Sequence, residues 1–252
     1  MGMSATPPFR YEAIFETVLR EEQPYQRWQK FAAALADIGC DQINYGFLDL
    51  ETAARMDARC DPALSTMAGD WLAHYVDRRY DLVDHVLAHV RAGNHAPMRW
   101  NNAPSRGTHS HIAFEEAREA GLRSGILVPL AGPRGSSLPG AAIMIGSSAR
   151  ETEFSRMFAG RLPELVSLAH LFHAGAVGEL LRRHDNAASL SGRERDVLRF
   201  IARGERIDQV AHRLSLARVT VELHLRNARR KLRCRTVAEA VARAMLYGEI
   251  QP

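Results

Sequence analysis

Long apolar runs are missing from this sequence of 252 residues. No stretch of about eighteen consecutive apolar residues occurs, and residues 1–13 (MGMSATPPFRYEA) lack the apolar region of a secretion signal. We therefore expect a cytoplasmic protein with no membrane partner. Its apolar fraction of 46% and charged fraction of 25% are typical of globular domains.

Cysteine is also scarce. Cys40, Cys60 and Cys234 are odd in number and far apart, and none belongs to a CxxC pair. This pattern argues against a disulfide framework and a structural zinc site, and it favours three small buried side chains. The histidines within residues 85–89 and 108–111 have no cysteine or carboxylate at a recognised metal-ligand spacing. We expect neither a metal nor a cofactor.

Catalytic and phosphorelay motifs are absent as well. The sequence has no glycine-rich phosphate loop, no Gly-x-Ser-x-Gly turn and no Cys–His pair at a recognised spacing. It also lacks the acidic pair that follows the first buried strand of a receiver domain. The chain is therefore not expected to be an enzyme.

Positive charge is concentrated in the last quarter of the chain. Residues 189–252 contain fourteen Arg and Lys against seven Asp and Glu, which gives +7. The totals of 33 basic and 29 acidic residues leave 19 and 22 for positions 1–188, which gives −3. Counterion release from a nucleic acid rewards such clustering, although a solvated basic face would carry the same charge.

Residues 189–252 have the pattern of four amphipathic helices. The first follows Ser191, which can act as an N-cap with Glu194 three residues later. Two short helices separated by a tight break, the second rich in Arg, are typical of a helix-turn-helix, with a small basic bundle as the alternative. The later helices are predicted over residues 207–214, 218–232 and 237–246.

The third of these helices is the candidate recognition helix, because such a helix places its N-terminal half in the major groove. Four side chains on the face away from its apolar stripe could reach base edges: Arg218, Val219, Glu222 and Arg226. Further DNA contacts, mainly to phosphates, are predicted for Thr220, His224, Asn227, Arg230 and Lys231.

The region before this domain mixes helical and strand-like patterns. Strands are predicted over residues 42–48, 124–130 and 141–146, with a turn over 133–139. Helices gathered on the faces of an antiparallel sheet give an α+β sensor domain, for which residues 1–175 are assigned. A linker over residues 176–188 then leads to the all-α helix-turn-helix domain over residues 189–252.

An aromatic and acidic stretch follows the first predicted strand. Trp71, Tyr75, Tyr80 and Asp84, with Trp100 further along, could place an indole N–H, a phenol and a carboxylate around an apolar cavity. The residues by themselves favour a simpler role as core aromatics and leave the ligand site as an alternative.

The C-terminal string LSGRERDVLRFIARG, followed by VTVELHLRNARRKL, resembles the DNA-binding domain of LuxR-type regulators. The family's opening Leu-Thr-x-Arg-Glu is matched by Leu190-Ser191-Gly192-Arg193-Glu194. Ala217 departs from the family because it stands where a Ser usually caps the recognition helix, a loss of about 1 kcal/mol. The resemblance implies a homodimer that binds a two-fold operator in double-stranded DNA.

The spacing Trp-x3-Tyr-x8-Asp resembles the acyl-homoserine-lactone site of quorum-sensing LuxR-type regulators. The resemblance implies that the Trp71 side chain donates to the lactone carbonyl, that Asp84 accepts from the amide N–H, and that Tyr75 lines the acyl region. Trp100 and Gly125 resemble the family's second Trp and its retained glycine.

Three positions depart from that family pattern. His85 replaces a Pro, Met67 stands where many members have a Tyr that bonds the acyl carbonyl, and Gly146 aligns with a Ser or Thr. The predicted ligand-binding set still includes Met67 and Tyr80. The departures imply a thinner set of polar contacts around the acyl carbonyl.

These patterns predict a ligand-responsive transcription regulator of the quorum-sensing type. An acyl-homoserine lactone is expected in the N-terminal domain, where its binding would stabilise the fold by mass action. One alternative is an orphan regulator whose N-terminal domain binds another small molecule or a protein partner. A second is an enzyme fused to a DNA-binding head, for which the sequence offers no catalytic constellation.

Overall fold

The computed structural model describes residues 11–21, 24–47, 64–100, 106–131, 140–185 and 187–251. Contacts between Cα atoms divide the chain into two compact units, Met1–His173 and Ala174–Pro252. Each unit is described by itself below. The predicted turn over residues 133–139 and Cys60 lie outside the described residues.

The first unit is built on a four-stranded antiparallel sheet with strand order β1-β4-β3-β2. The central strands β3 and β4 are buried along their whole length, and they pair from Ser124 opposite Ser147 to Leu130 opposite Ala141. Because both faces of this pair are covered, their sequences are almost continuously apolar. The strand bounds are β1 Gln42–Phe47, β2 Met98–Arg99, β3 Ser124–Leu130 and β4 Ala141–Ser147.

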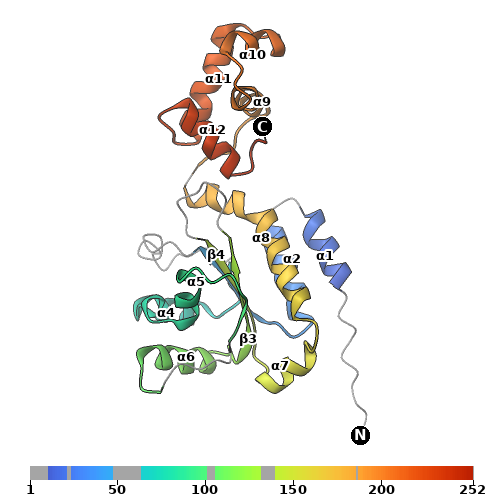
Figure 1. The fold of residues 1–252 in the computed structure, drawn as a ribbon, viewed down its shortest axis with the longest axis vertical. Coiled ribbons are helices and arrows are strands. Elements are labelled where there is room, and N and C mark those ends of the chain that lie inside the picture. The colour runs from blue at the N-terminus through green and yellow to red at the C-terminus, as the bar shows by residue number, and fades with distance from the viewer. Residues whose placement is uncertain are drawn as a thin grey trace. The chain divides into compact units, whose positions relative to one another are not determined.

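Helices cover both faces of the sheet, and this confirms the α+β class (Figure 1). One group contains α1 (Tyr11–Arg20), α2 (Pro24–Ala36), α7 (Glu151–Met157) and the N-terminal part of α8 (Leu162–His184). The opposite group contains α4 (Gly69–Asp77), the 3₁₀ turn η2 (Tyr80–Leu82), α5 (His85–Arg91) and α6 (His109–Glu119).

Alternation along the strands gives the two helix groups separate cores. On the face toward α2 and α8, Phe31 stacks on Phe172 at 4.8 Å between ring centroids, and Tyr45 of β1 meets Phe172 edge-on. Ala142 and Met144 of β4 belong instead to the cluster under α4 and α6. The second cluster contains the aromatic residues predicted to bind a ligand.

Beyond α8, the described residues of the second unit form the four predicted helices in order, α9 Gly192–Ala202, α10 Ile207–Leu214, α11 Arg218–Lys231 and α12 Val237–Leu246. Ser191 caps α9 and forms the predicted capping box with Glu194. Ser215 turns the chain between α10 and α11 with a φ of 53°. Ala217 precedes α11 without a side-chain capping bond, as its methyl side chain requires.

Part of the predicted linker is ordered against the last helix of the second unit. Helix α8 continues to His184, and a Cβ on Gly178 would lie 2.4 Å from the backbone oxygen of Tyr247. The Tyr247 hydroxyl in turn donates to the Asp185 carboxylate. Only glycine permits this close approach at position 178.

Candidate ligand site and nucleic-acid interface

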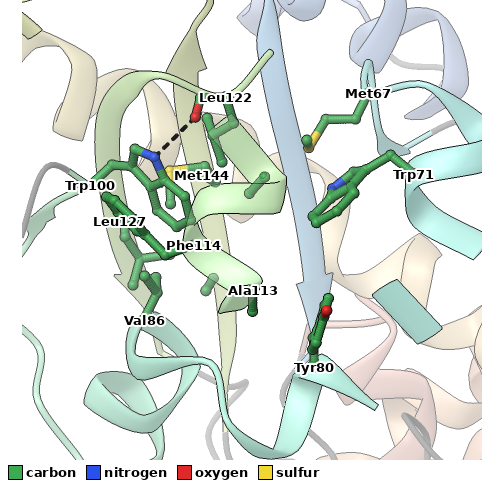
Figure 2. Close-up of a cluster of buried hydrophobic side chains, with 12 residues drawn as sticks. Met67, Trp71, Tyr80, Val86, Trp100, Ala113, Phe114, Leu122, Leu127 and Met144 are labelled. Atoms are coloured by element: carbon green, nitrogen blue, oxygen red, sulfur yellow. Dashed lines mark hydrogen bonds between the residues drawn. The ribbon is translucent and has the colours of Figure 1, made fainter. Parts of the chain in front are cut away.

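A cluster of buried side chains lies between the sheet and the helices α4, α5 and α6 (Figure 2). In the close-up, Trp71, Met67 and Tyr80 stand opposite a group that includes Trp100, Phe114 and Val86. The buried members of the cluster are Met67, Trp71, Tyr80, Val86, Trp100, Ala113, Phe114, Ala117, Leu122, Leu127, Ala142 and Met144, and Tyr75 and Val83 are among its partly buried neighbours.

Trp71 on α4 supplies the indole of the candidate site. Its ring lies 6.1 Å from Tyr75 and 6.5 Å from Tyr80, measured between centroids, and only 9% of the residue is exposed. Among the residues that the structure describes, nothing accepts a hydrogen bond from its indole N–H. An N–H donor at an apolar wall can therefore serve an acceptor on a ligand.

Asp84 joins α4 to α5 through both of its carboxylate oxygens. One oxygen caps α5 by accepting from the Val86 backbone N–H at 2.7 Å, and the other accepts from the Tyr75 hydroxyl at 2.8 Å. Burial, and then the negative charge of Asp84, raises the pKa of Tyr75 well above its usual value. The phenol therefore stays protonated and donates to Asp84, while the Tyr75 ring itself lies against that of Trp71.

Trp100 and Met67 line the cluster with apolar surface, because the polar atom of each side chain already has a partner within the protein. Trp100 stacks on Phe114 at 4.9 Å between centroids, and its indole N–H donates to the Leu122 carbonyl at 3.2 Å. The Met67 sulfur lies 2.6 Å from the Asn44 amide nitrogen. Of the two indole donors in the cluster, only that of Trp71 has no partner within the described residues.

Gly125 serves the packing of the sheet. A Cβ at this position would lie 2.7 Å from both the Gly146 Cα and the Ile145 oxygen. A Cβ on Gly146 would in turn lie 2.2 Å from a methyl carbon of Leu122. The two opposed glycines allow β3 and β4 to pair closely, so the backbone accounts for Gly125 without any ligand contact.

A polar group that the sequence did not point to lies beside this site. One Glu116 oxygen on α6 accepts from the Tyr80 hydroxyl at 2.8 Å and lies 2.7 Å from the His74 Nε2 atom. The hydrogen bond from His74, followed by that from Tyr80, lowers the pKa of Glu116. His74 and Glu116 are far apart in sequence and belong to no motif, so only the fold brings them together.

Within the described residues no helix is long and apolar enough to cross a membrane, and no group of three His, Cys, Asp or Glu side chains could hold a metal. Cys40 is buried, as predicted for a small core side chain, and Cys234 is half-buried.

Helix α11 of the second unit has apolar side chains on both its buried and its exposed face. Val221, Leu225 and Ala228 are buried against the other helices, while Val219 is 69% exposed and Leu223 46% exposed. Val219 is among the predicted DNA contacts, whereas Leu223 is an exposed apolar residue outside the predicted set.

The charged residues of α11 differ in how far they are engaged within the unit. Arg218 forms ion pairs with Asp208 of α10 and Glu222, each at 3.0 Å. Arg226 is exposed and has no partner among the described residues. The Lys231 ammonium lies 2.7 Å from the Glu194 carboxylate, which is only 4% exposed. This ion pair ties α11 to the first turn of α9 and points to a structural role for Lys231.

The remaining predicted DNA contacts lie on the same helix. Arg230 is exposed and donates to the Asn227 side-chain oxygen at 3.3 Å, and Thr220 and His224 are half-buried. Of the exposed arginines of α11, Arg226 and Arg230 have no ion-pair partner among the described residues, whereas Arg218 has two.

Comparison with known proteins places these two units in known families. Residues 24–176 match the family described as "Autoinducer binding domain", and residues 188–244 match "Bacterial regulatory proteins, luxR family". The first match alone covers more than half of the chain. The chain belongs to the autoinducer-binding LuxR family.

Relatives of this LuxR-family chain include two quorum sensing-dependent transcriptional regulators. RpaR of Rhodopseudomonas palustris is 30% identical over 187 residues, which is 72% of each protein. VjbR of Brucella abortus is 28% identical over 227 residues, which is 85% of this chain and 84% of VjbR. The family therefore makes this chain a transcriptional regulator with an autoinducer-binding domain.

Two solved structures share the fold. SdiA in complex with octanoyl-rac-glycerol covers 100% of this chain and 99% of its own, with a TM-score of 0.51 at 18% identity. The N-acylhomoserine lactone-dependent CepR2 of Burkholderia cenocepacia covers 68% of this chain and 95% of its own, with a TM-score of 0.50 at 22% identity.

Proposed function

We propose that this chain is a cytoplasmic quorum-sensing regulator that binds an acyl-homoserine lactone in its first unit. As a homodimer it would then bind a two-fold operator through α11. The observation that carries the ligand assignment is the Trp71 indole N–H, which has no partner among the described residues and whose ring lies against Tyr75, the hydrogen-bond donor to Asp84, in an apolar cluster. A lactone ring and its amide need such a donor and such an acceptor, and an acyl chain needs apolar surroundings.

Asp84 can serve the ligand while it keeps its internal partners. A carboxylate has about four lone-pair positions, and the bonds from Val86 and Tyr75 use two of them. The ligand's amide N–H would take a third. Trp100, whose donor is already used, would contribute its ring surface to the acyl region.

A different amphiphilic ligand is the second candidate. Met67, Met144 and Val86 line the cluster with apolar groups, so these side chains provide few hydrogen-bond partners for the carbonyl group of an acyl chain. An ester of similar size, with one polar head and one chain, would use the same Trp71 donor. This candidate keeps the regulator and changes only its signal.

Thermal unfolding with acyl-homoserine lactones of increasing chain length tests the proposal. A ligand that binds only the folded state raises the Tm, and about one hundred times its Kd adds about 2.7 kcal/mol of stability. Trp71→Phe keeps the ring and removes the donor, so we expect a roughly fivefold loss of affinity from one lost hydrogen bond.

Trp100→Phe is the matched control, because it makes the same chemical change in the same cluster at a donor that is already satisfied. We expect it to lower the Tm without ligand and to reduce the ligand-induced shift less than Trp71→Phe does, because it removes ring surface but no hydrogen-bond donor to the ligand. Equal shifts in wild type and Trp71→Phe would remove Trp71 from the binding site. No shift with any lactone, but a shift with an acylglycerol, would transfer the assignment to the second candidate.

A further inference from the structure

Three charged side chains form a continuous array where α10 meets α11. The Arg218 Nη1 atom lies 3.0 and 3.1 Å from the two Asp208 oxygens, and its Nε atom donates to a Glu222 oxygen at 3.0 Å. Arg218 and Glu222 are one helical turn apart, so they lie on the same face of α11. Asp208 reaches this face from the preceding helix.

The array is exposed in the free protein. The side chains of Asp208, Arg218 and Glu222 are 69%, 60% and 43% exposed, so water and salt screen their attraction. Such an array contributes little to folding. Its place on the exposed face of the predicted recognition helix gives it a different use.

The charge of Glu222 makes it an unusual side chain to bring toward DNA, because phosphates repel it. Arg218 offsets that repulsion, since its guanidinium is bound to the Glu222 carboxylate. Asp208 holds the same guanidinium from the other side and limits its freedom to leave Glu222 for a phosphate. The array therefore presents a carboxylate that is oriented and partly neutralised.

A carboxylate can only accept hydrogen bonds, and this restricts which base it can recognise. In the major groove, guanine and the thymine carbonyl present acceptors that repel a carboxylate. Adenine sets an acceptor beside its amino group, whereas cytosine presents its N4 amino donor alone. We propose that Glu222, held by Arg218 and Asp208, reads a cytosine at one position of each operator half-site.

This inference rests on the proposed binding of DNA through α11, and the test separates the two. The full-length chain, with and without a mixture of acyl-homoserine lactones, is used to select duplexes from a random-sequence pool. The same selection is made with Glu222→Gln, with Asp208→Asn and with Asp196→Asn. Asp196 is the matched control, because Asp196→Asn also removes one negative charge, from a carboxylate whose ion-pair partners, Arg193 and Arg199, lie on its own helix α9.

Wild type and Asp196→Asn are expected to enrich the same motif, with cytosine at one position of each half-site. Glu222→Gln is expected to lose that preference by roughly tenfold and to move it toward adenine, the usual partner of an amide side chain. Asp208→Asn is expected to keep the cytosine with a weaker preference. The other positions of the motif stay unchanged in all variants.

Two results would overturn the inference. If the wild type selects a motif and Glu222→Gln keeps its full cytosine preference, Glu222 is not the reader, while DNA binding by α11 stands. If the wild type enriches no motif under either condition, the proposed operator binding fails and the inference fails with it.

Discussion

At the scale of single residues, the two tryptophans of the ligand cluster show what a sequence can and cannot indicate. Both were assigned to the site by resemblance, and both are buried in one cluster. Their indole N–H groups differ. That of Trp100 donates to the Leu122 carbonyl, whereas that of Trp71 has no acceptor among the described residues. That difference depends on where a backbone carbonyl of another element lies. No local pattern around either tryptophan carries this information.

His173 is a buried histidine in the core of the first unit that faces α2 and α8. Its Nε2–H donates to the Ala131 carbonyl at 2.9 Å, so its Nδ1 accepts from the Tyr45 hydroxyl at 2.8 Å. Burial lowers the pKa of His173, and the folded state therefore keeps the ring neutral.

Acidification is expected to destabilise the first unit through His173. An unfolded chain takes up a proton at this histidine below about pH 6.5, whereas the folded chain resists it. The stability is therefore fully present above that pH and is lost as the pH falls toward the lowered folded value. Tm values measured between about pH 8 and about pH 5 should fall more steeply for wild type than for His173→Gln, which does not titrate.

His89 is a suitable comparison for that experiment, since its Nε2 atom also lies near a backbone carbonyl, that of Ala96, but on an exposed part of the surface. His89→Gln makes the same substitution outside this core and is measured in parallel as the control variant. Parallel curves for wild type and His173→Gln would show that burial of His173 does not control acid stability.

At the scale of elements, the strands and the four C-terminal helices were predictable because each has a strong local pattern. β3 and β4 are nearly continuous apolar runs, and the capping box of α9 lies within four residues of sequence. The elements between residues 69 and 91 were not assigned as helices, because their burial depends on partners in α6 and β4. Gly125 enters the predicted site through its resemblance to the family's retained glycine, whereas its close approach to Gly146 is visible only in the paired sheet.

The exposed apolar row on α11 leads to a prediction about thymine. Val219 and Leu223 are one helical turn apart, and both are exposed on the proposed interface. Thymine presents a C5 methyl group in the major groove, and uracil lacks it. Each methyl group buried against this row should contribute about 0.8 kcal/mol, or roughly a fourfold change in affinity.

Fluorescence anisotropy with a duplex selected by the wild type checks this prediction. Each thymine is replaced in turn by uracil, which leaves every hydrogen-bonding group in place. We expect at least one thymine-to-uracil substitution per half-site to weaken binding by the wild type. The same substitution should have little effect on the affinity of the Leu223→Ala or the Val219→Ala variant. Equal affinity of the wild type for all substituted duplexes would show that the apolar row does not contact thymine methyl groups.

At the scale of the whole molecule, the division of charge agrees with the division of the chain into family domains. The excess of +7 lies in residues 189–252, and the luxR-family match covers residues 188–244. The autoinducer-binding match lies in the part with a net charge of −3. An uncharged signal needs no surrounding positive field, whereas a DNA duplex gains from one. The charge distribution therefore agrees with DNA binding by the last quarter of the chain, although a solvated basic face would carry the same charge and composition could not indicate the signal.

Separate sites for signal and DNA should respond separately to mutation. Arg226 is exposed on α11, and it has no ion-pair partner in the described part of the chain. Loss of an Arg that contacts a guanine costs about 1–3 kcal/mol, so Arg226→Ala should weaken operator binding by roughly tenfold or more. Arg203→Ala removes the same charge beside α9, where the side chain lies against the Phe200 ring, and should weaken binding far less.

The Tm shift produced by the lactone should be the same in wild type and both variants, because neither arginine belongs to the first unit. A smaller lactone shift in Arg226→Ala alone would mean that the two functions are not separable in this chain, and that α11 contributes to the stability of the ligand-bound state.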